Sequence, residues 1–194
     1  MIREIVLASA SKRRSQILKS CNIRHRAVAS RAKEPNKGGS IFSIVKTNAR
    51  RKALKVLLTN KKSVIIGADT LVRLGKELIG KPKNKKQAKG LLKKFSGRRL
   101  EVVTGLFVID GISKKSSSGC EKSELFVREM SPSEIDAYFK ALKPYDKAGG
   151  FSIEGAGSFI FDDIRGSYFN ILGLPMARLH GLFKEIGLSL LFDF

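Results

Sequence analysis

The sequence predicts an α/β fold, and two observations lead to it. Short apolar, β-branched runs alternate along the chain with longer segments whose apolar residues recur at helical spacing. The 194 residues are 42% hydrophobic, which suffices for one globular domain over residues 1–194, or for two small lobes that share a core. We find no repeat and no interdomain linker, so we expect a single domain.

The first half of the chain predicts strands and helices in turn. Ser40–Leu58 is the longest predicted helix, because its apolar residues fall on one helical face. Ser63–Gly67 is a β-branched run typical of a buried strand, and two short runs around Gly75 indicate a hairpin. The expected elements are strand Ile2–Ala8, helix Arg13–Ser20, helix Ser40–Leu58, strand Ser63–Gly67 and hairpin strands Leu71–Leu74 and Glu77–Ile79.

The second half predicts a long β-hairpin between helices. The first strand turns at Asp110-Gly111, and Ser131 is placed to cap the helix that follows the second strand. The Ser/Lys-rich stretch Ser113–Gly119 is expected to be a flexible loop. The expected elements are helix Asn84–Phe95, strands Arg99–Ile109 and Glu121–Glu129, helix Pro132–Leu142, strand Phe159–Ile164 and helix Pro175–Ile186.

The charge of the chain is strongly positive and unevenly placed. The net charge is +21; residues 1–100 hold 28 lysines and arginines against four acids, and residues 101–194 hold 10 against 13. This asymmetry indicates an anionic partner for the first half. Runs such as Lys83-Asn84-Lys85-Lys86 are equally consistent with solvated surface, so charge alone leaves both interpretations open.

Several classes of protein are disfavoured. No apolar stretch is long enough for a membrane-spanning helix, and the start of the chain lacks the order of a signal peptide. Cys21 and Cys120 have no metal-type spacing, and His25 and His180 stand outside any cluster. No P-loop and no dinucleotide-binding glycine motif is present. We therefore expect a cytoplasmic protein with reduced thiols and no membrane partner.

The loop from Ser9 to Arg14 is a candidate phosphate site. A strand leads through a hydroxyl-rich loop into a helix, whose N-terminus presents free N–H groups and a positive dipole end. Lys12, Arg13 and Arg14 crowd that same positive end. This placement is unfavourable without a partner, and a bound polyphosphate would offset it. The alternative is an exposed helix start with solvated bases.

Two carboxylates are candidates for metal binding or proton transfer. Asp69 comes just after a predicted buried strand, where α/β folds place ligand groups, and Glu34 stands in a basic, turn-like stretch. Near a triphosphate they could hold Mg²⁺, and one could activate a water. From spacing alone, Asp69 could equally satisfy a turn, and Glu34 could pair with a lysine. Lys52 and Lys81 could act as point charges on a phosphate.

Five motifs in chain order resemble the Maf family of nucleoside triphosphate pyrophosphatases, also called septum formation proteins. They cover nearly the whole chain. The motifs are Leu7-Ala8-Ser9-Ala10-Ser11-Lys12-Arg13-Arg14, Gly67-Ala68-Asp69-Thr70, Gly80-Lys81-Pro82, Asp146-Lys147-Ala148-Gly149-Gly150 and Asn170-Ile171-Leu172-Gly173-Leu174-Pro175.

The resemblance implies a fold, an activity and a set of site residues. The fold would be an elongated mixed β-sheet with flanking helices, in two lobes around a central cleft, of the Maf/ITPase-like kind. The activity would convert nucleoside triphosphates, including non-canonical ones, to the monophosphate and pyrophosphate with Mg²⁺ or Mn²⁺. Asp69 would be the catalytic acidic residue, acting as the proton acceptor, or a metal ligand together with Glu34. Phosphate binding would fall to Ser9, Ser11, Arg13, Arg14, Lys52 and Lys81.

The base preference implied by the resemblance is that of dTTP/UTP pyrophosphatases. Arg13, Thr70 and Glu154 match the positions that set it. Gly67-Ala68-Asp69-Thr70 is typical of that type, but Glu154 stands where its members carry glutamine. An ionised glutamate only accepts hydrogen bonds, so we expect weaker selectivity for dTTP and UTP than in members with glutamine.

The competing interpretation is a basic nucleic-acid-binding protein or a cell-division protein without catalysis. The chain has no tryptophan, no recognisable nucleic-acid motif and no interleaving of bases with aromatics. The expected partner is therefore a nucleoside triphosphate. Weak non-specific binding to nucleic acid and assembly as a homodimer are left open.

Overall fold

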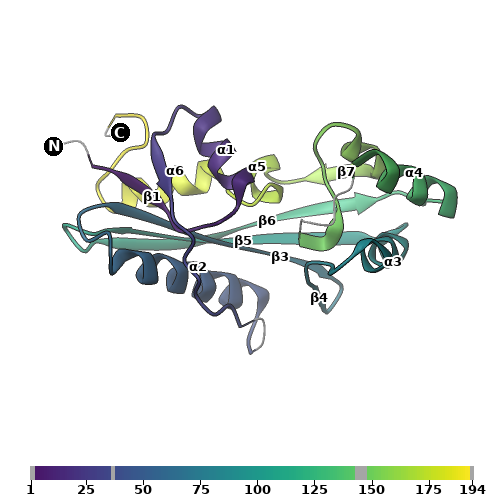
Figure 1. The fold of residues 1–194 in the computed structure, drawn as a ribbon, viewed down its shortest axis with the longest axis horizontal. Helices are drawn as coiled ribbons and strands as arrows, with labels where there is room; N and C mark the ends of the chain where they lie inside the picture. Colours follow the sequence, from purple (N-terminus) through teal and green to yellow (C-terminus); the bar gives the residue numbers. More distant parts are fainter. Residues whose placement is uncertain (1–2, 36–37, 143–147, 193–194) are drawn as a thin grey trace. The chain divides into compact units, whose positions relative to one another are not determined.

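The computed structural model describes residues 3–35, 38–142 and 148–192 (Figure 1). The described strands form one mixed sheet in the order β2-β1-β3-β5-β6-β7, with β4 paired to β3. β1 is parallel to β2 and β3, whereas β4 and β7 join antiparallel neighbours, which confirms the predicted α/β class. The strands are β1 (Ile5–Leu7), β2 (His25–Ala27), β3 (Val64–Leu74), β4 (Glu77–Ile79), β5 (Arg99–Asp110), β6 (Ser116–Val127) and β7 (Phe161–Arg165).

Each predicted helix is present to within a residue or so at its ends, and the short helix α5 was not predicted. Ser131 caps α4 as expected: its hydroxyl accepts from the Glu134 N–H at 3.3 Å, while its own N–H donates to the Glu134 carboxylate at 2.8 Å. None of the helices in the described ranges has the length and apolar character that crossing a bilayer requires. They are α1 (Lys12–Ser20), α2 (Ile41–Leu57), α3 (Lys85–Phe95), α4 (Pro132–Leu142), α5 (Tyr168–Ile171) and α6 (Met176–Glu185).

β2 was not predicted, and the predictions for β3 and β6 were the ones furthest wrong in their bounds. β3 continues without a break to Leu74, so Asp69 lies inside a strand and not just after one. β6 begins at Ser116, so Ser116–Gly119 is strand where we expected loop. The turn that joins β5 to β6 is shorter, and Lys114 closes it with a φ of 60°. Pairing with a long neighbouring strand therefore overrides the low strand propensity of serine and glycine.

The contacts divide the chain into two compact units. The first comprises Met1–Thr70, Val103–Glu121 and Tyr168–Phe194; the second comprises Leu71–Val102 and Lys122–Ser167. In the first unit, α2 covers one face of the strands, and α1 and α6 lie over the other (Figure 1). The predicted cleft between two lobes stays a prediction.

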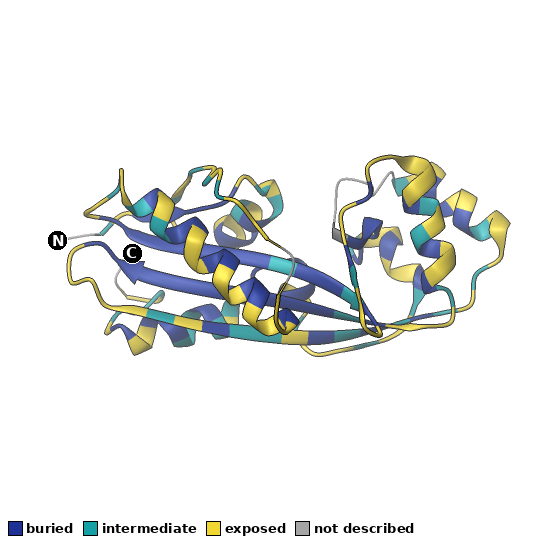
Figure 2. Ribbon diagram, turned by 90° about the horizontal axis from the view of Figure 1, so that it is seen from below, coloured by how far each residue is buried: buried dark blue, intermediate teal, exposed yellow. Residues whose placement is uncertain are grey.

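Helix α2 approaches the strands of the first unit unusually closely, because glycines face it. A Cβ on Gly67 would lie 2.1 Å from the backbone oxygen of Ala49, and one on Gly105 would lie 2.4 Å from the carbonyl carbon of Val45. Ala53 adds a second small side chain to the helix face. Figure 2 shows α2 with one buried and one exposed face. The close approach lets short polar side chains of α2 reach β3.

The second unit has its own buried polar contacts. The Tyr138 hydroxyl on α4 accepts from the Ser152 N–H at 2.8 Å, and burial raises the pKa of Tyr138 to about 12. At the exposed start of α4, hydrogen bonds from the Ser131 N–H and from the Arg128 guanidinium lower the pKa of Glu134 to about 2. Gly149 and Gly150 have φ of 75° and 70°, which places them in the left-handed region that favours glycine.

Candidate functional site

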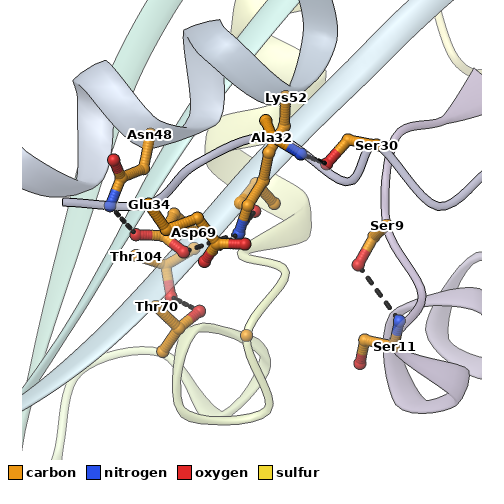
Figure 3. A network of polar contacts seen from close by, with 12 residues as sticks. Ser9, Ser11, Ser30, Ala32, Glu34, Asn48, Lys52, Asp69, Thr70 and Thr104 are labelled. Atoms are coloured by element: carbon orange, nitrogen blue, oxygen red, sulfur yellow. Dashed lines mark hydrogen bonds and ion pairs between the residues drawn. The ribbon is translucent and has the colours of Figure 1, made fainter. Parts of the chain in front are cut away.

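The loop between β1 and α1 gathers hydroxyls and positive charge. Ser9 Oγ accepts a hydrogen bond from the Ser11 N–H at 3.2 Å (Figure 3), and Ser11 Oγ caps α1 by accepting from the Arg14 N–H at 3.4 Å. The first turn of α1 holds no acidic residue and carries Lys12 and Arg13. A pocket of about 450 Å³ opens beside it. This is the arrangement expected of an anion site.

The Arg14 side chain points into the protein, whereas the alternative interpretation expected a solvated base at an exposed helix start. Its Nε donates to the Gly173 carbonyl at 2.7 Å, and its Nη1 donates to the Ala68 carbonyl at 2.9 Å and to Ser9 Oγ at 3.2 Å. Its Nη2 donates to Thr70 Oγ1 at 2.9 Å. Burial lowers the pKa of the guanidinium, and the charges of Asp69 and Glu34 oppose that effect. Four of the five guanidinium N–H groups are therefore committed to protein acceptors.

A chain of hydroxyl hydrogen bonds decides whether the Thr70 hydroxyl donates or accepts a hydrogen bond. Thr104 Oγ1 donates its proton to the Asn170 carbonyl at 3.1 Å. The hydrogen bond of 2.9 Å between Thr70 and Thr104 must therefore be donated by Thr70 (Figure 3). Since Arg14 already donates to Thr70, the Thr70 hydroxyl has only acceptor capacity left for a ligand.

Two side chains of α2 hold the Asp69 carboxylate. Asn48 and Lys52 are four residues apart, so they lie on the same helix face, and both are buried. Lys52 Nζ donates to Asp69 Oδ1 at 2.7 Å, and Asn48 Nδ2 donates to Asp69 Oδ2 at 2.9 Å. Asp69 itself is 5% exposed. Its carboxylate is thus held at both oxygens, as Figure 3 shows.

Lys52 also joins Glu34 to this group. Its Nζ lies 2.9 Å from Glu34 Oε2, so one ammonium lies between two carboxylates. The loop that carries Glu34 is tied to α2 by Lys55 Nζ, which donates to the Arg31 carbonyl at 3.1 Å, and it has an internal hydrogen bond from the Ala32 N–H to Ser30 Oγ at 3.4 Å. Glu34 is about half exposed, so it is the accessible member of the pair.

Most of the predicted site residues of the first unit therefore come together. Ser9, Arg14, Thr70, Lys52, Asp69 and Glu34 are joined by the contacts above. Ser11 and Arg13 belong to the adjoining helix start, where Arg13 is partly exposed. Asn48 and Thr104 were not predicted. Asn48 carries one usable sequence signal, because a polar residue stands four positions before Lys52 on an otherwise apolar helix face.

The remaining predicted residues belong to the second unit or to undescribed positions. Lys81 is exposed and follows β4, and Glu154 is partly exposed at the start of the 3₁₀ turn Gly155–Ile160. Their shared role with Asp69 stays a prediction. Asp146 and Lys147, from the fourth motif, lie outside the described residues.

The carboxylate pair has the donor chemistry that a hard divalent cation prefers. Across the described ranges, no group of three or more His, Cys, Asp or Glu side chains could hold a metal. Glu34 and Asp69 supply oxygen donors, and the Lys52 ammonium between them shows that the pair accommodates a positive charge. Mg²⁺ is commonly held by one or two carboxylates together with substrate phosphates and waters. The donor set fits such an ion.

Known proteins similar to this chain span nearly its full length. A family model described as Maf-like protein matches residues 4–186. The dTTP/UTP pyrophosphatase of Dictyoglomus thermophilum is 38% identical over 193 residues, which is 98% of this chain and 100% of that protein. The dTTP/UTP pyrophosphatase of Aquifex aeolicus is 39% identical over 184 residues, which is 95% of this chain and 96% of that protein.

A solved structure shares the fold. The Staphylococcus aureus Ham1 protein matches with a TM-score of 0.54 at 15% identity, over 94% of this chain and 98% of that one. At this identity the likeness concerns the arrangement of the strands and helices alone.

Proposed function

This chain belongs to the Maf family, and on that premise we propose that it is a nucleoside triphosphate pyrophosphatase that converts dTTP and UTP to the monophosphate and pyrophosphate. The observation that carries the proposal is the Asp69 carboxylate, buried and held at both oxygens. It is joined through Lys52 and Arg14 to a helix start suited to phosphate. The family model runs through both compact units, which supports treating residues 1–194 as one functional domain.

The proposed reaction is attack by a water oxygen on the α-phosphorus. The new P–O bond replaces the bond to the oxygen that bridges the α and β phosphates, and pyrophosphate leaves with that oxygen. The proton of the water passes to a base, and Asp69 is the buried carboxylate of the site. Asp69 serves either as this base or as a metal ligand, and both roles require its fixed orientation.

A divalent ion, Mg²⁺ or Mn²⁺, would be held by Glu34 and Asp69. When bound, it would neutralise charge on the phosphates and on the pyrophosphate that leaves. Lys52 lies between the two carboxylates, so we propose that its ammonium keeps its contact with Asp69 Oδ1 and turns from Glu34 toward the phosphates when the site is loaded. The divalent ion would then take the place of the ammonium at Glu34.

The residues around this pair would bind the rest of the triphosphate. Ser9, Ser11 and Arg13 would contact phosphate oxygens at the start of α1. Arg14 has one N–H left for a ligand, so its main role would be to hold the loop in place. Lys81, in the second unit, would be a further phosphate contact, as the motif resemblance implies.

The Thr70 hydroxyl, which can only accept a hydrogen bond from a ligand, is suited to uracil and thymine. This hydroxyl has acceptor capacity only, and both of these bases carry an N–H at N3 that can donate to it. Glu154 would also accept from an N–H, but it would be unfavourable beside a base carbonyl. Because relatives of this chain are named dTTP/UTP pyrophosphatases and Thr70 suits their bases, we propose dTTP and UTP as substrates, with selectivity weakened by Glu154.

A nucleotide panel tests this function. Purified protein with Mg²⁺ or Mn²⁺ is expected to release pyrophosphate, and no orthophosphate, from dTTP and UTP faster than from dCTP. Release of orthophosphate, or equal rates with every base, would contradict the proposed bond or the proposed preference respectively. Sequence-specific, salt-resistant binding to DNA without hydrolysis would support the competing interpretation.

A further inference from the structure

Asn48 is a polar residue at a position where an apolar one would be expected. It lies on the buried face of α2 beside Ala49 and Val45, and it is 0% exposed. Its Nδ2 donates to Asp69 Oδ2 at 2.9 Å and lies 3.5 Å from the Pro35 carbonyl oxygen. Its Oδ1 is buried with no hydrogen-bond partner among the residues that the structure describes.

The orphaned oxygen makes Asn48 costly for the fold. A buried polar atom without a partner destabilises a protein, and an apolar side chain of the same size would remove that cost. The amide cannot correct this by flipping, because Oδ1 would then lie against Asp69 Oδ2, and two acceptors would face each other. A residue that lowers stability at such a position is expected to serve the site it contacts.

The close packing of α2 explains how so short a side chain reaches Asp69. Gly67 lies two residues before Asp69 on β3, and the absence of a Cβ there lets the backbone of Ala49 approach the strand. Asn48 precedes Ala49, so the same approach brings its amide to the carboxylate. The contact between Asn48 and Asp69 is therefore built by the fold.

We propose that Asn48 is a positioning residue for the hydrolysis: it holds Asp69 Oδ2 while Lys52 holds Oδ1, and the two together fix the plane of the carboxylate. The inference rests on the proposed function, since it gives Asn48 a role only through Asp69. Lys52 alone would leave the carboxylate free to rotate about one contact, whereas two donors on one rigid helix define a single orientation.

Asn48→Leu tests the inference, with Thr47→Leu as the matched control. Thr47 is the exposed neighbour on the same helix. Asn48→Leu is expected to lower kcat for dTTP about 10–100-fold, the range typical of residues that orient a reacting group, with KM changed less than about twofold. Its thermal unfolding midpoint is expected to change little, because removal of the orphaned oxygen offsets the loss of the donor to Asp69 Oδ2. A purely structural role would lower the midpoint.

A double-mutant cycle separates action through Asp69 from any other effect. On an Asp69→Asn background, Asn48→Leu is expected to change kcat by less than about twofold, since the group it orients is already altered. A full 10–100-fold loss on that background would overturn the inference, as would wild-type kcat in Asn48→Leu alone. These outcomes leave the proposed function standing, because they require an active wild type; a wild type that hydrolyses no nucleotide contradicts the function itself.

Discussion

Replacing Arg14 by alanine should destabilise the protein more than it weakens nucleotide binding. Four acceptors lose a donor, but three of them keep a partner: Ser9 Oγ accepts from the Ser11 N–H, the Ala68 carbonyl oxygen is 3.4 Å from Lys52 Nζ, and Thr70 Oγ1 is bonded to Thr104. The Gly173 carbonyl loses the donor at 2.7 Å.

The loss of stability in Arg14→Ala can be worked out from these hydrogen bonds. One orphaned carbonyl costs about 1–3 kcal/mol, and the lost packing of a buried side chain adds to it. Removing a buried cation returns part of its desolvation cost. We expect a net loss of about 2–4 kcal/mol in the free energy of unfolding. For a chain of this size that is on the order of 5–15 °C in the unfolding midpoint.

Thermal and urea unfolding, followed by circular dichroism, measure the loss in Arg14→Ala. Lys12→Ala is the control, because Lys12 is exposed on the same helix turn. An Arg14→Ala variant within about 0.5 kcal/mol of the wild type, with a KM for dTTP raised tenfold or more, would refute the reasoning. Arg14 would then be mainly a phosphate ligand, as the motif resemblance implies.

Three further predictions concern base preference, packing and pH. Glu154→Gln should raise the rate with dTTP relative to dGTP, because it restores an amide donor; an unchanged ratio would show that Glu154 does not read the base. Gly67→Ala should lower stability by more than about 2 kcal/mol, because its Cβ would meet the Ala49 backbone oxygen at 2.1 Å, whereas Gly90→Ala, which meets nothing within 4 Å, should not; equal midpoints would refute the close approach. The pKa of Glu134 is lowered from 4.5 to about 2, so its contribution to stability is present above pH 4.5 and is lost as the pH falls toward 2; Glu134→Gln should flatten the stability profile across that window, and an unchanged profile would contradict the capping contacts.

The elements with strong periodicity could be predicted from the sequence, and the weakly patterned ones could not. α2 and α4 were predicted to within a residue or two, because their apolar residues repeat at helical spacing. β2 is only three residues long and has no apolar alternation; it forms by pairing with β1. The first residues of β6 are likewise strand only because a long neighbour is available. Pairing with a neighbouring strand, and not local sequence pattern, therefore makes β2 and the start of β6 strands.

Of the site, only the residues that belong to the sequence motifs or stand out by charge could be predicted. Asp69 stood out as one of four acids in the basic half, and the structure places it at the centre of the contacts. The polar partners in the site come from elsewhere in the chain: Asn48 contacts Asp69 from α2, and Thr104 on β5 contacts Thr70, the residue after Asp69. No spacing rule connects these residues, because the glycines that let α2 approach β3 act only in the folded chain.

Pyrophosphate release from dTTP by Asp69→Asn tests the central claim most directly. Asparagine keeps the size of the side chain but removes the negative charge. Its oxygen can still accept from Lys52, and its N–H can donate to Asn48 Oδ1 once the Asn48 amide flips, so the fold and nucleotide binding should remain. We predict a kcat lowered about 10²–10⁴-fold at saturating Mg²⁺, with an exposed acid, Asp162→Asn, as the control that retains wild-type turnover. An Asp69→Asn protein that is folded and turns over dTTP at the wild-type rate would contradict the account.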